Sequence, residues 1–494
     1  MQRRSIAVML LLFLATFSVS AHVGSPDVFF EGDAGPYHLF VTVLVPQVIP
    51  GVAQIQVRCA SSDVEKIEIV PMRLSGPGSN LPPTPDVAER SKQDPQFFTG
   101  SLWLMEFGAL KVRVTAEGGK GKGELAVPVP AFARRSLPMD KALGGLLGFL
   151  MLFLAVGLVF IAGAAAREGN LDPGESPSPK KKTRARIVMA VTAMVVLGIL
   201  YLGNAWWGLE AQSYSRDINL FKPPLAETSV VNGNHLVIRA AGRDPEWSKE
   251  VKMEDVIPDH GHLMHLFLIG APGLDCIWHL HPAQAPGGTF ADDLPSMPGG
   301  HYQLFADIVD KSGFPWTLVG QLDVPQINGK TLTGDDSAWS GPPLAAQPIE
   351  STTAQLADGG RLVWEKPSAP LAANLALDLK FKIEDKDGNP AKDVEPYMGM
   401  AGHAEIVGSD FSTFAHIHPA GSISMAALEL ANSQVPSAAK DVLGGQMTMP
   451  MSAVPLAPEV SFPYGFPKAG TYRIFVQIKR AGQIETGVFD LHVQ

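Results

Sequence analysis

The sequence predicts a mainly β protein with three extracytoplasmic β-sandwiches of the immunoglobulin or cupredoxin type and a two-helix transmembrane hairpin between the first and the second. Three observations predict it: short alternating polar and apolar stretches, 49 glycines and 41 prolines among 494 residues, and two long apolar runs. Alternation with period two is typical of strands, and glycine and proline interrupt strands at turns. Apolar runs of about twenty residues can cross a bilayer as helices.

The first 21 residues have the pattern of a secretory signal peptide. Arg3 and Arg4 precede an apolar stretch, and small residues lead to a cleavage position after Ala21. Cleavage there makes His22 the mature N-terminus, whose α-amine and imidazole together suit Cu(II). The plainer alternative is that cleavage leaves a histidine there by chance. Alternating stretches from Tyr37 onward then predict an N-terminal β-sandwich over residues 22–135.

Two apolar runs, over residues 143–165 and 187–207, are expected to be transmembrane helices. The loop between them, residues 166–186, is rich in lysine and arginine, which collect on the cytoplasmic side of a membrane. We therefore expect a protein of the bacterial inner membrane with its N- and C-terminal domains on the periplasmic side. Residues 208–229 are predicted to form a linker to two outer sandwiches, 230–345 and 346–494.

Composition excludes several classes of function. A formal net charge of −10 with only 18% charged residues disfavours a nucleic-acid partner, which requires a basic face. The two cysteines, Cys59 and Cys276, are too few and too far apart for a thiolate zinc cluster or a redox pair, and whether they are free stays open. We find no nucleophile elbow, phosphate loop or zinc-protease motif, so an enzyme is not expected.

The strongest functional signal is a short motif that occurs twice. The segment His279-Leu280-His281-Pro282 recurs one domain later as His416-Ile417-His418-Pro419. Residues two apart on a strand share a face, so each pair of histidines can chelate one ion. Another histidine precedes each motif, His265 in the first copy and His403 in the second. We expect one metal site from each copy: His265, His279 and His281 in the first, and His403, His416 and His418 in the second.

The residues upstream of each copy suggest which metal is bound. His260 and His262 in the first copy align with Met398 and Met400 in the second. Imidazole suits Cu(II) or Zn(II), whereas thioether sulfur selects soft ions such as Cu(I), so copper is expected and zinc less so. Further candidate sulfur ligands follow the second copy, and each of them is alternatively a packing residue: Met425, Met447, Met449 and Met451.

The sequence also resembles known families. The region from Gly261 to Tyr302 and its echo at 416–421 resemble domains of bacterial envelope proteins near copper and heavy-metal handling systems. The N-terminal part, with Ala34-Gly35-Pro36-Tyr37, is similar to periplasmic β-sandwich modules of the YtkA-like or FixH-like type. The resemblance implies cupredoxin-like domains that handle copper. Because Cys276 has no cysteine counterpart in the second copy, a blue-copper electron-transfer centre is not expected.

Two hypotheses from different classes follow. In the first, the protein is anchored by its two helices and binds or buffers metal, with a metal-transport or envelope protein as partner. In the second, it is an envelope assembly protein whose sandwiches contact other proteins and whose histidines are structural, each hydrogen-bonding a turn. Convergent imidazoles within a few ångströms would favour the first hypothesis, and singly buried histidines the second.

Overall fold

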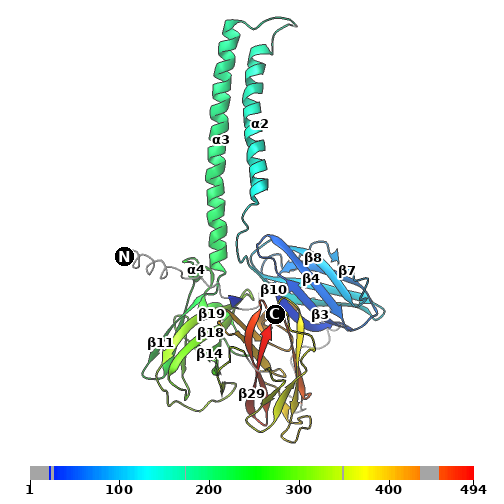
Figure 1. The fold of residues 1–494 in the computed structure, drawn as a ribbon, viewed down its shortest axis with the longest axis vertical. Coiled ribbons are helices and arrows are strands. Elements are labelled where there is room, and N and C mark those ends of the chain that lie inside the picture. The colour runs from blue at the N-terminus through cyan, green and yellow to red at the C-terminus, as the bar shows by residue number, and fades with distance from the viewer. Residues whose placement is uncertain (1–21, 24–26, 173, 348–349, 434–455) are drawn as a thin grey trace, which may run out of the picture. The chain divides into compact units, whose positions relative to one another are not determined.

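The computed structural model describes residues 22–23, 27–172, 174–347, 350–433 and 456–494 (Figure 1). The expected signal peptide lies outside these residues. The chain divides into two compact units, one formed by residues 1–132 with 222–494 and the other by residues 133–221. The fold is mainly β with two long apolar helices, as predicted. The sandwich type and the number of domains stay predictions.

The N-terminal β region of the first unit forms two antiparallel sheets. One has five strands in the order β2-β3-β4-β8-β7, and the other has four in the order β10-β9-β5-β6. Alternate residues are buried along β4, and the same alternation in the sequence predicted that strand. Their bounds are β2 Val28–Ala34, β3 Tyr37–Leu44, β4 Gly51–Cys59, β5 Val64–Arg73, β6 Asp86–Val87, β7 Glu89–Arg90, β8 Phe97–Leu104, β9 Gly108–Gly118 and β10 Gly121–Ala131.

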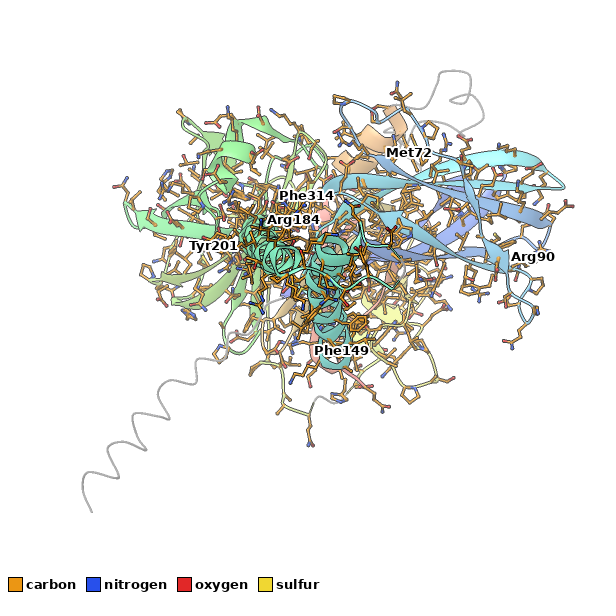
Figure 2. The ribbon with its side chains drawn as sticks, turned by 90° about the horizontal axis from the view of Figure 1, so that it is seen from above. Met72, Arg90, Phe149, Arg184, Tyr201 and Phe314 are labelled. Carbon is orange, nitrogen blue, oxygen red and sulfur yellow. The ribbon has the colours of Figure 1, made fainter. Side chains whose placement is uncertain are left out.

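The second unit is a helical hairpin of α2 (Lys141–Glu168) and α3 (Pro179–Leu220), seen end-on in Figure 2. Both helices are long and apolar enough to cross a membrane. Their large side chains point outward, as Phe149 on α2 and Tyr201 on α3 show, with 65% and 73% of their surface exposed. At Gly163 the helices approach so closely that a Cβ would lie 2.5 Å from Met189. A hairpin with an apolar exterior is suited to a lipid environment.

Helix α3 extends beyond the expected span at both ends. It begins at Pro179, so the lysines beside the span are helical, and it continues to Leu220 through much of the segment expected to be a linker. Proline at the first position with Ser178 as N-cap favours a helix start there. No proline interrupts the chain again before Pro223 and Pro224, which end the helix.

The first outer region, residues 225–340, forms one ten-stranded sheet. The sequence indicates a single opening strand at 230–240, but the structure has a hairpin there, because Asn232 and Gly233 have φ values of 52° and 90° and form a tight turn. The elements are β11 Leu225–Val231, β12 His235–Ala241, α4 Trp247–Glu250, a 3₁₀ turn Met253–Asp255, β13 Val256–Ile257, β14 His265–Gly270, β15 Cys276–Leu280, β16 Ala283–Ala285, β17 Thr289–Asp293, β18 Gly300–Asp310, β19 Pro315–Val324 and β20 Ser337–Ser340.

The second outer region, residues 353–493, has a four-stranded sheet and a six-stranded sheet over a shared apolar core. The six-stranded sheet includes β1 (His22–Val23), which pairs in parallel with β26. The other elements are β21 Thr353–Gln355, β22 Arg361–Trp364, β23 Leu377–Glu384, β24 Val394–Glu395, β25 His403–Gly408, β26 Thr413–Ile417, α5 Met425–Ser433, β27 Glu459–Tyr464, β28 Gly470–Arg480 and β29 Gln483–Val493.

Equivalent strands recur in the two outer regions. We call β13, β14, β15, β18 and β19 copy 1, and β24, β25, β26, β28 and β29 copy 2. In each copy the closing hairpin carries a tyrosine, Tyr302 or Tyr472, that donates a hydrogen bond to the carbonyl four residues earlier at 2.7 Å. The registers also match, since His265 lies opposite Asp307 in copy 1 and His403 opposite Gln477 in copy 2.

The two copies pack against each other through one face of their sheets. Phe305 of copy 1 stacks on Phe414 of copy 2 with ring centroids 4.2 Å apart, and Phe267 lies beside them. Arg473 of copy 2 donates across the interface to the carbonyl of Leu274 at 2.7 Å. Farther along the same strands the contact face changes from apolar residues to histidines. The interface between the copies therefore has an apolar half and a histidine half.

Candidate metal centre

A tight turn precedes the histidines in each copy. The turn at 259–262 has His260 and Gly261 at φ values of 52° and 84°, and the turn at 397–400 has Met398 and Gly399 at 49° and 81°. Two successive positive φ values are characteristic of a type I′ turn. The alignment of His260 and His262 with Met398 and Met400 is therefore confirmed as a structural equivalence. It places His260 at the tip of a turn that reaches toward copy 2.

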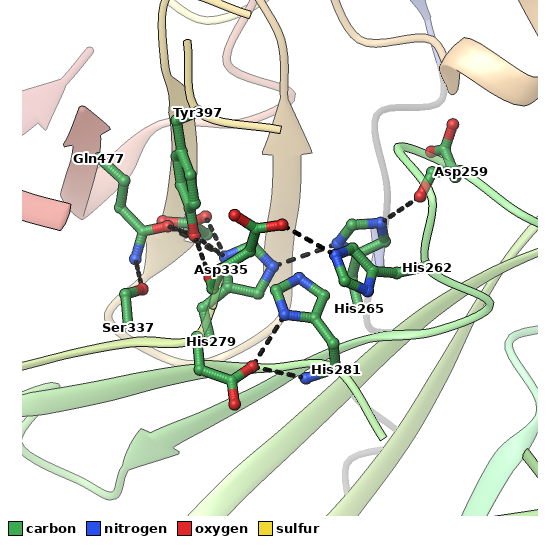
Figure 3. A network of polar contacts seen from close by, with 11 residues as sticks. Asp259, His262, His265, His279, His281, Asp335, Ser337, Tyr397 and Gln477 are labelled. Atoms are coloured by element: carbon green, nitrogen blue, oxygen red, sulfur yellow. Dashed lines mark hydrogen bonds and ion pairs between the residues drawn. The ribbon is translucent and has the colours of Figure 1, made fainter. Parts of the chain in front are cut away.

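The first group of histidines, His265, His279 and His281, comes from β14 and the end of β15 (Figure 3). One ring nitrogen from each lies within 4.8 Å of one from each of the others. His265 Nδ1 and His279 Nε2 are 3.2 Å apart. Ligand nitrogens bound to one ion at about 2.0–2.1 Å are separated by roughly this distance. We call this group the first triad, and it contains the three residues that the sequence predicts.

Hydrogen bonds fix which nitrogen of each ring keeps its lone pair. His265 donates from Nε2 to the carbonyl of Asp259 at 3.0 Å, and His281 donates from Nδ1 to Asp336 at 2.9 Å. His279 Nδ1 lies 3.0 Å from Gln477 Oε1, and this oxygen faces it because the amide nitrogen of Gln477 donates to a serine. A neutral imidazole has one N–H, so the remaining nitrogens present lone pairs to one another.

The second group consists of His260, His403 and His418, again with ring nitrogens within 4.8 Å of one another. His418 donates from Nδ1 to the carbonyl of Ile423 at 2.9 Å, which leaves its Nε2 facing His260 Nε2 at 3.1 Å. His403 is fully buried, and within the described part of the chain neither of its nitrogens has a hydrogen-bond partner. We call this group the second triad. It spans the interface, because His260 belongs to the first outer region.

Burial keeps these rings neutral. It lowers the pKa of His265, His279 and His403 well below the ordinary value of 6.5. The pKa values of His260 and His418 are lowered to about 4, also chiefly by burial. The nearby imidazoles lower each pKa further, because two adjacent positive rings repel. Neutral imidazole is the form that binds a metal ion.

His416 differs from the expected grouping. The sequence places it with His403 and His418, whereas the structure sets His260 in that position and His416 between the two triads. Its ring centroid is 5.3 Å from that of His265 and 4.6 Å from that of His418. The difference arises because the motif strands face the other copy, so a histidine from the first outer region can complete a site in the second.

Each copy supplies a polar partner to the motif histidine of the other. Gln477 of copy 2 accepts from His279 of copy 1, and Asp307 of copy 1 lies 3.4 Å from Nδ1 of His416 in copy 2. Asp307 and Gln477 occupy equivalent positions in their copies. The two copies thus form a pseudo-symmetric pair, with the same kind of contact made in both directions. Burial raises the pKa of Asp307 to about 7.

Glu405 is a buried acidic residue of the cluster. It lies opposite His416 on the neighbouring strand, and its Oε1 is 3.9 Å from His279 Nδ1. The residue is fully buried, which raises its pKa well above the ordinary value, and among the residues described neither oxygen has a hydrogen-bond partner. A buried carboxyl without partners is costly unless a positive charge compensates it. A cation bound nearby would compensate the charge of its ionised form.

The remaining predicted ligands have different positions. His262 stacks on His281, with centroids 3.9 Å apart, and its side chain is 29% exposed at the rim of the first triad. Met398 is buried and its backbone contacts His260, while Met400 is half-buried in the turn. Met425 begins α5, two residues after Ile423, whose carbonyl accepts a hydrogen bond from His418. Met447, Met449, Met451 and the side chain of His22 lie outside the described residues; the backbone of His22 pairs with Thr413.

Sequence reasoning missed five polar residues of the site. Asp307, Gln477 and Glu405 are single polar residues within apolar strands, and the first two follow the repeated tyrosine by five positions. That pattern was available in the sequence. Asp335 and Asp336 precede β20 in a segment that the sequence suggests is loose, and only the pairing of β20 with β15 brings them beside His262 and His281.

Comparisons with known proteins add little. A family model described as a domain of unknown function (DUF8832) matches residues 355–494, and no curated protein matches the chain. Solved structures that resemble it include a bacterial ice-binding adhesin (6% identity, 90% of this chain and 89% of that one, TM-score 0.15). Others are the ICAM-5 D1-D4 ectodomain fragment (7%, 93% and 82%, 0.14) and MtrC from Shewanella baltica (8%, 64% and 72%, 0.15). Similarity at this level supports no functional argument.

Proposed function

We propose that the protein binds transition-metal ions, copper in particular, at the two histidine triads. The observation that carries the proposal is the close approach of two ring nitrogens in each triad. His265 Nδ1 faces His279 Nε2 at 3.2 Å, and His260 Nε2 faces His418 Nε2 at 3.1 Å. Two unprotonated nitrogens at this distance repel each other unless a proton or a metal ion lies between them.

The surroundings of the first triad also support a metal site. Histidines that bind metal generally donate their other N–H to a carbonyl or carboxylate, which fixes the ring and its tautomer. Here a carbonyl, an amide oxygen and a carboxylate play this part. Copper is favoured over zinc because Cu(II) has the higher affinity for a given nitrogen site. The methionines at the positions equivalent to histidines also favour copper.

A copper titration of the full-length protein in detergent micelles tests this proposal. We expect Cu(II) to bind with a dissociation constant below micromolar, and His279→Ala together with His418→Ala to abolish that binding. The matched control is His301→Ala with His492→Ala, because these histidines lie on exposed strand positions outside the cluster. Circular dichroism checks that both double variants fold. Binding that is weaker than micromolar, or equal in both variants, contradicts the proposal and favours a structural role for the histidines.

We further propose that α2 and α3 anchor the protein in a bacterial inner membrane, with both β-rich parts on the periplasmic side. Two crossings return the chain to the side of the membrane from which it started, which supports one side for both β-rich parts. The lysines and arginines near the connection between α2 and α3 favour the cytoplasmic side of the membrane for that connection. A cysteine introduced at Ser176 should react with an impermeant maleimide only in permeabilised cells, and one at Lys386 in intact spheroplasts.

A further inference from the structure

The two triads are direct neighbours. His260 of the second triad and His265 of the first have ring centroids 5.8 Å apart. An ion lies about 3 Å from the centroid of a ring that binds it through nitrogen. Ions in the two triads would therefore be separated by at most about 12 Å, and by less if the ions lie on the sides that face each other. At such a separation two bound divalent ions would repel each other electrostatically.

His416 occupies the space between the triads. Its centroid lies 5.6 Å from His279 of the first triad and 5.5 Å from His403 of the second. Asp307 lies at its Nδ1, and its Nε2 is buried with no hydrogen-bond partner in the described chain. An imidazole with a carboxylate beside one nitrogen and the other nitrogen unused is suited to binding a metal ion through the second nitrogen.

Glu405 would supply a negative charge to the same space once cations are bound there. It lies on β25 two residues after His403 and opposite His416, and its carboxyl is close to His279. It is thus near members of both triads while bonded to neither. Two divalent ions in a cavity lined only by neutral imidazoles would repel strongly, and an enclosed carboxylate reduces that repulsion. Copy 1 has Phe267 at the equivalent position, so of the two copies copy 2 carries the carboxyl at this position of the central strand.

We propose that the two triads hold a dinuclear copper centre across the interface, in which His416 is the additional ligand between the ions and Glu405 the carboxylate that balances their charge. The inference rests on the proposed metal-binding function and extends it. Two separate buffering sites would not require a further histidine or a carboxylate between them. A dinuclear centre would use both the histidine and the carboxylate.

Electron paramagnetic resonance of the full-length protein, loaded with one and then two equivalents of Cu(II), tests the proposal. With two equivalents we expect dipolar broadening and a half-field transition, which require two Cu(II) ions at short range. The variant His416→Ala should keep the first equivalent and bind the second at least about ten-fold more weakly, in line with the loss of one ligand. The control is His492→Ala, an exposed histidine of the same sheet, which should behave as the unchanged protein.

The outcomes separate the two proposals. If no copper binds, both fail. If copper binds but the protein takes one equivalent, or two with the spectrum of isolated ions, metal binding stands and the dinuclear centre is overturned. If His416→Ala binds both equivalents as tightly as the His492→Ala control, His416 is not the additional ligand. Circular dichroism of each variant shows whether a loss of binding reflects a loss of fold.

Discussion

Copy 1 and copy 2 share a backbone and a histidine framework, yet differ in nearly every other polar residue of the site. Equivalent positions hold His262 and Met400 at the turn and Phe267 and Glu405 on the central strand. The copies were therefore free to change around the histidines. What both retain is the set of residues that converges at the interface. This difference indicates that the site is formed by the two copies together, and that each copy alone provides an incomplete site.

The two triads also differ in how they are covered. The strand β20 borders copy 1 and brings Asp335 and Asp336 to the first triad, where their side chains are 31% and 26% exposed. The second triad lies near α5, whose Ala426 donates from its backbone to Asp259 at 2.7 Å. Helix α5 packs in turn against the N-terminal β region. The first triad thus has a polar rim that is open to solvent, and the second is enclosed.

The largest effect should come from the apolar half of the interface. Phe414→Ala removes a ring that is 1% exposed and stacked on Phe305, so we expect a loss of about 3–5 kcal/mol of unfolding free energy. Trp339, which packs at this interface, reports it by fluorescence during urea unfolding. Trp103→Ala, at an exposed strand position, is the control and should change little. Equal losses in both variants would show that the apolar half does not hold the copies together.

The open rim of the first triad predicts the next effect. Asp336→Asn weakens the hydrogen bond that orients His281, so Cu(II) affinity of the first triad should fall about 10–100-fold. Asp323→Asn is a matched control, because Asp323 pairs with the exposed His301 at a similar distance, 2.8 Å, outside the cluster. Isothermal titration calorimetry measures the Cu(II) affinity of both variants. A fall of the same size in the control would mean that general electrostatics, and not orientation of His281, is responsible.

Much of this fold was predictable from the sequence because local patterns determine it. Alternation predicted strands β3, β4 and β18, and length with hydropathy predicted the two helices. The convergence of His265, His279 and His281 also follows from neighbouring strands within one sheet. The position of His260 in the second triad does not follow from the sequence, because it depends on how two sheets pack. Alternation shows that His416 shares a face with His418, but it cannot show that this face meets another copy instead of its own core.

The pH dependence of copper retention tests the burial of the second triad. Because the pKa values of His260 and His418 are lowered to about 4, these rings stay neutral as the pH falls from 7 to 5. Exposed histidines would begin to take up protons near 6.5. Copper should therefore remain bound at pH 5.5 and leave only below about 4. Half-release between pH 6 and 7, measured after dialysis, would show that the site is open to solvent.

The same shifts affect the stability of the metal-free protein. Histidines of the unfolded chain take up protons below about 6.5, whereas the buried ones do not until about 4, so their contribution to stability is complete above pH 6.5 and decreases as the pH falls. The raised pKa values of Asp307 and Glu405 act in the opposite direction, since these carboxyls favour the folded state at low pH. Bound copper should leave the histidine part of this dependence in place, because coordinated rings take up no protons while the unfolded chain still does.

The smallest expected effect distinguishes the copies at a single position. His262→Met gives copy 1 the residue of copy 2, at the rim and not within a triad. We expect Cu(II) affinity to fall only a few-fold, because His262 stacks on His281 without belonging to the triad, and Cu(I) affinity to stay the same or rise. The reciprocal variant, Met400→His, should do the opposite at the second triad. Competition titrations with Cu(I) and Cu(II) chelators measure both affinities. If His262→Met abolishes Cu(II) binding, His262 is itself a ligand and the first site has four histidines.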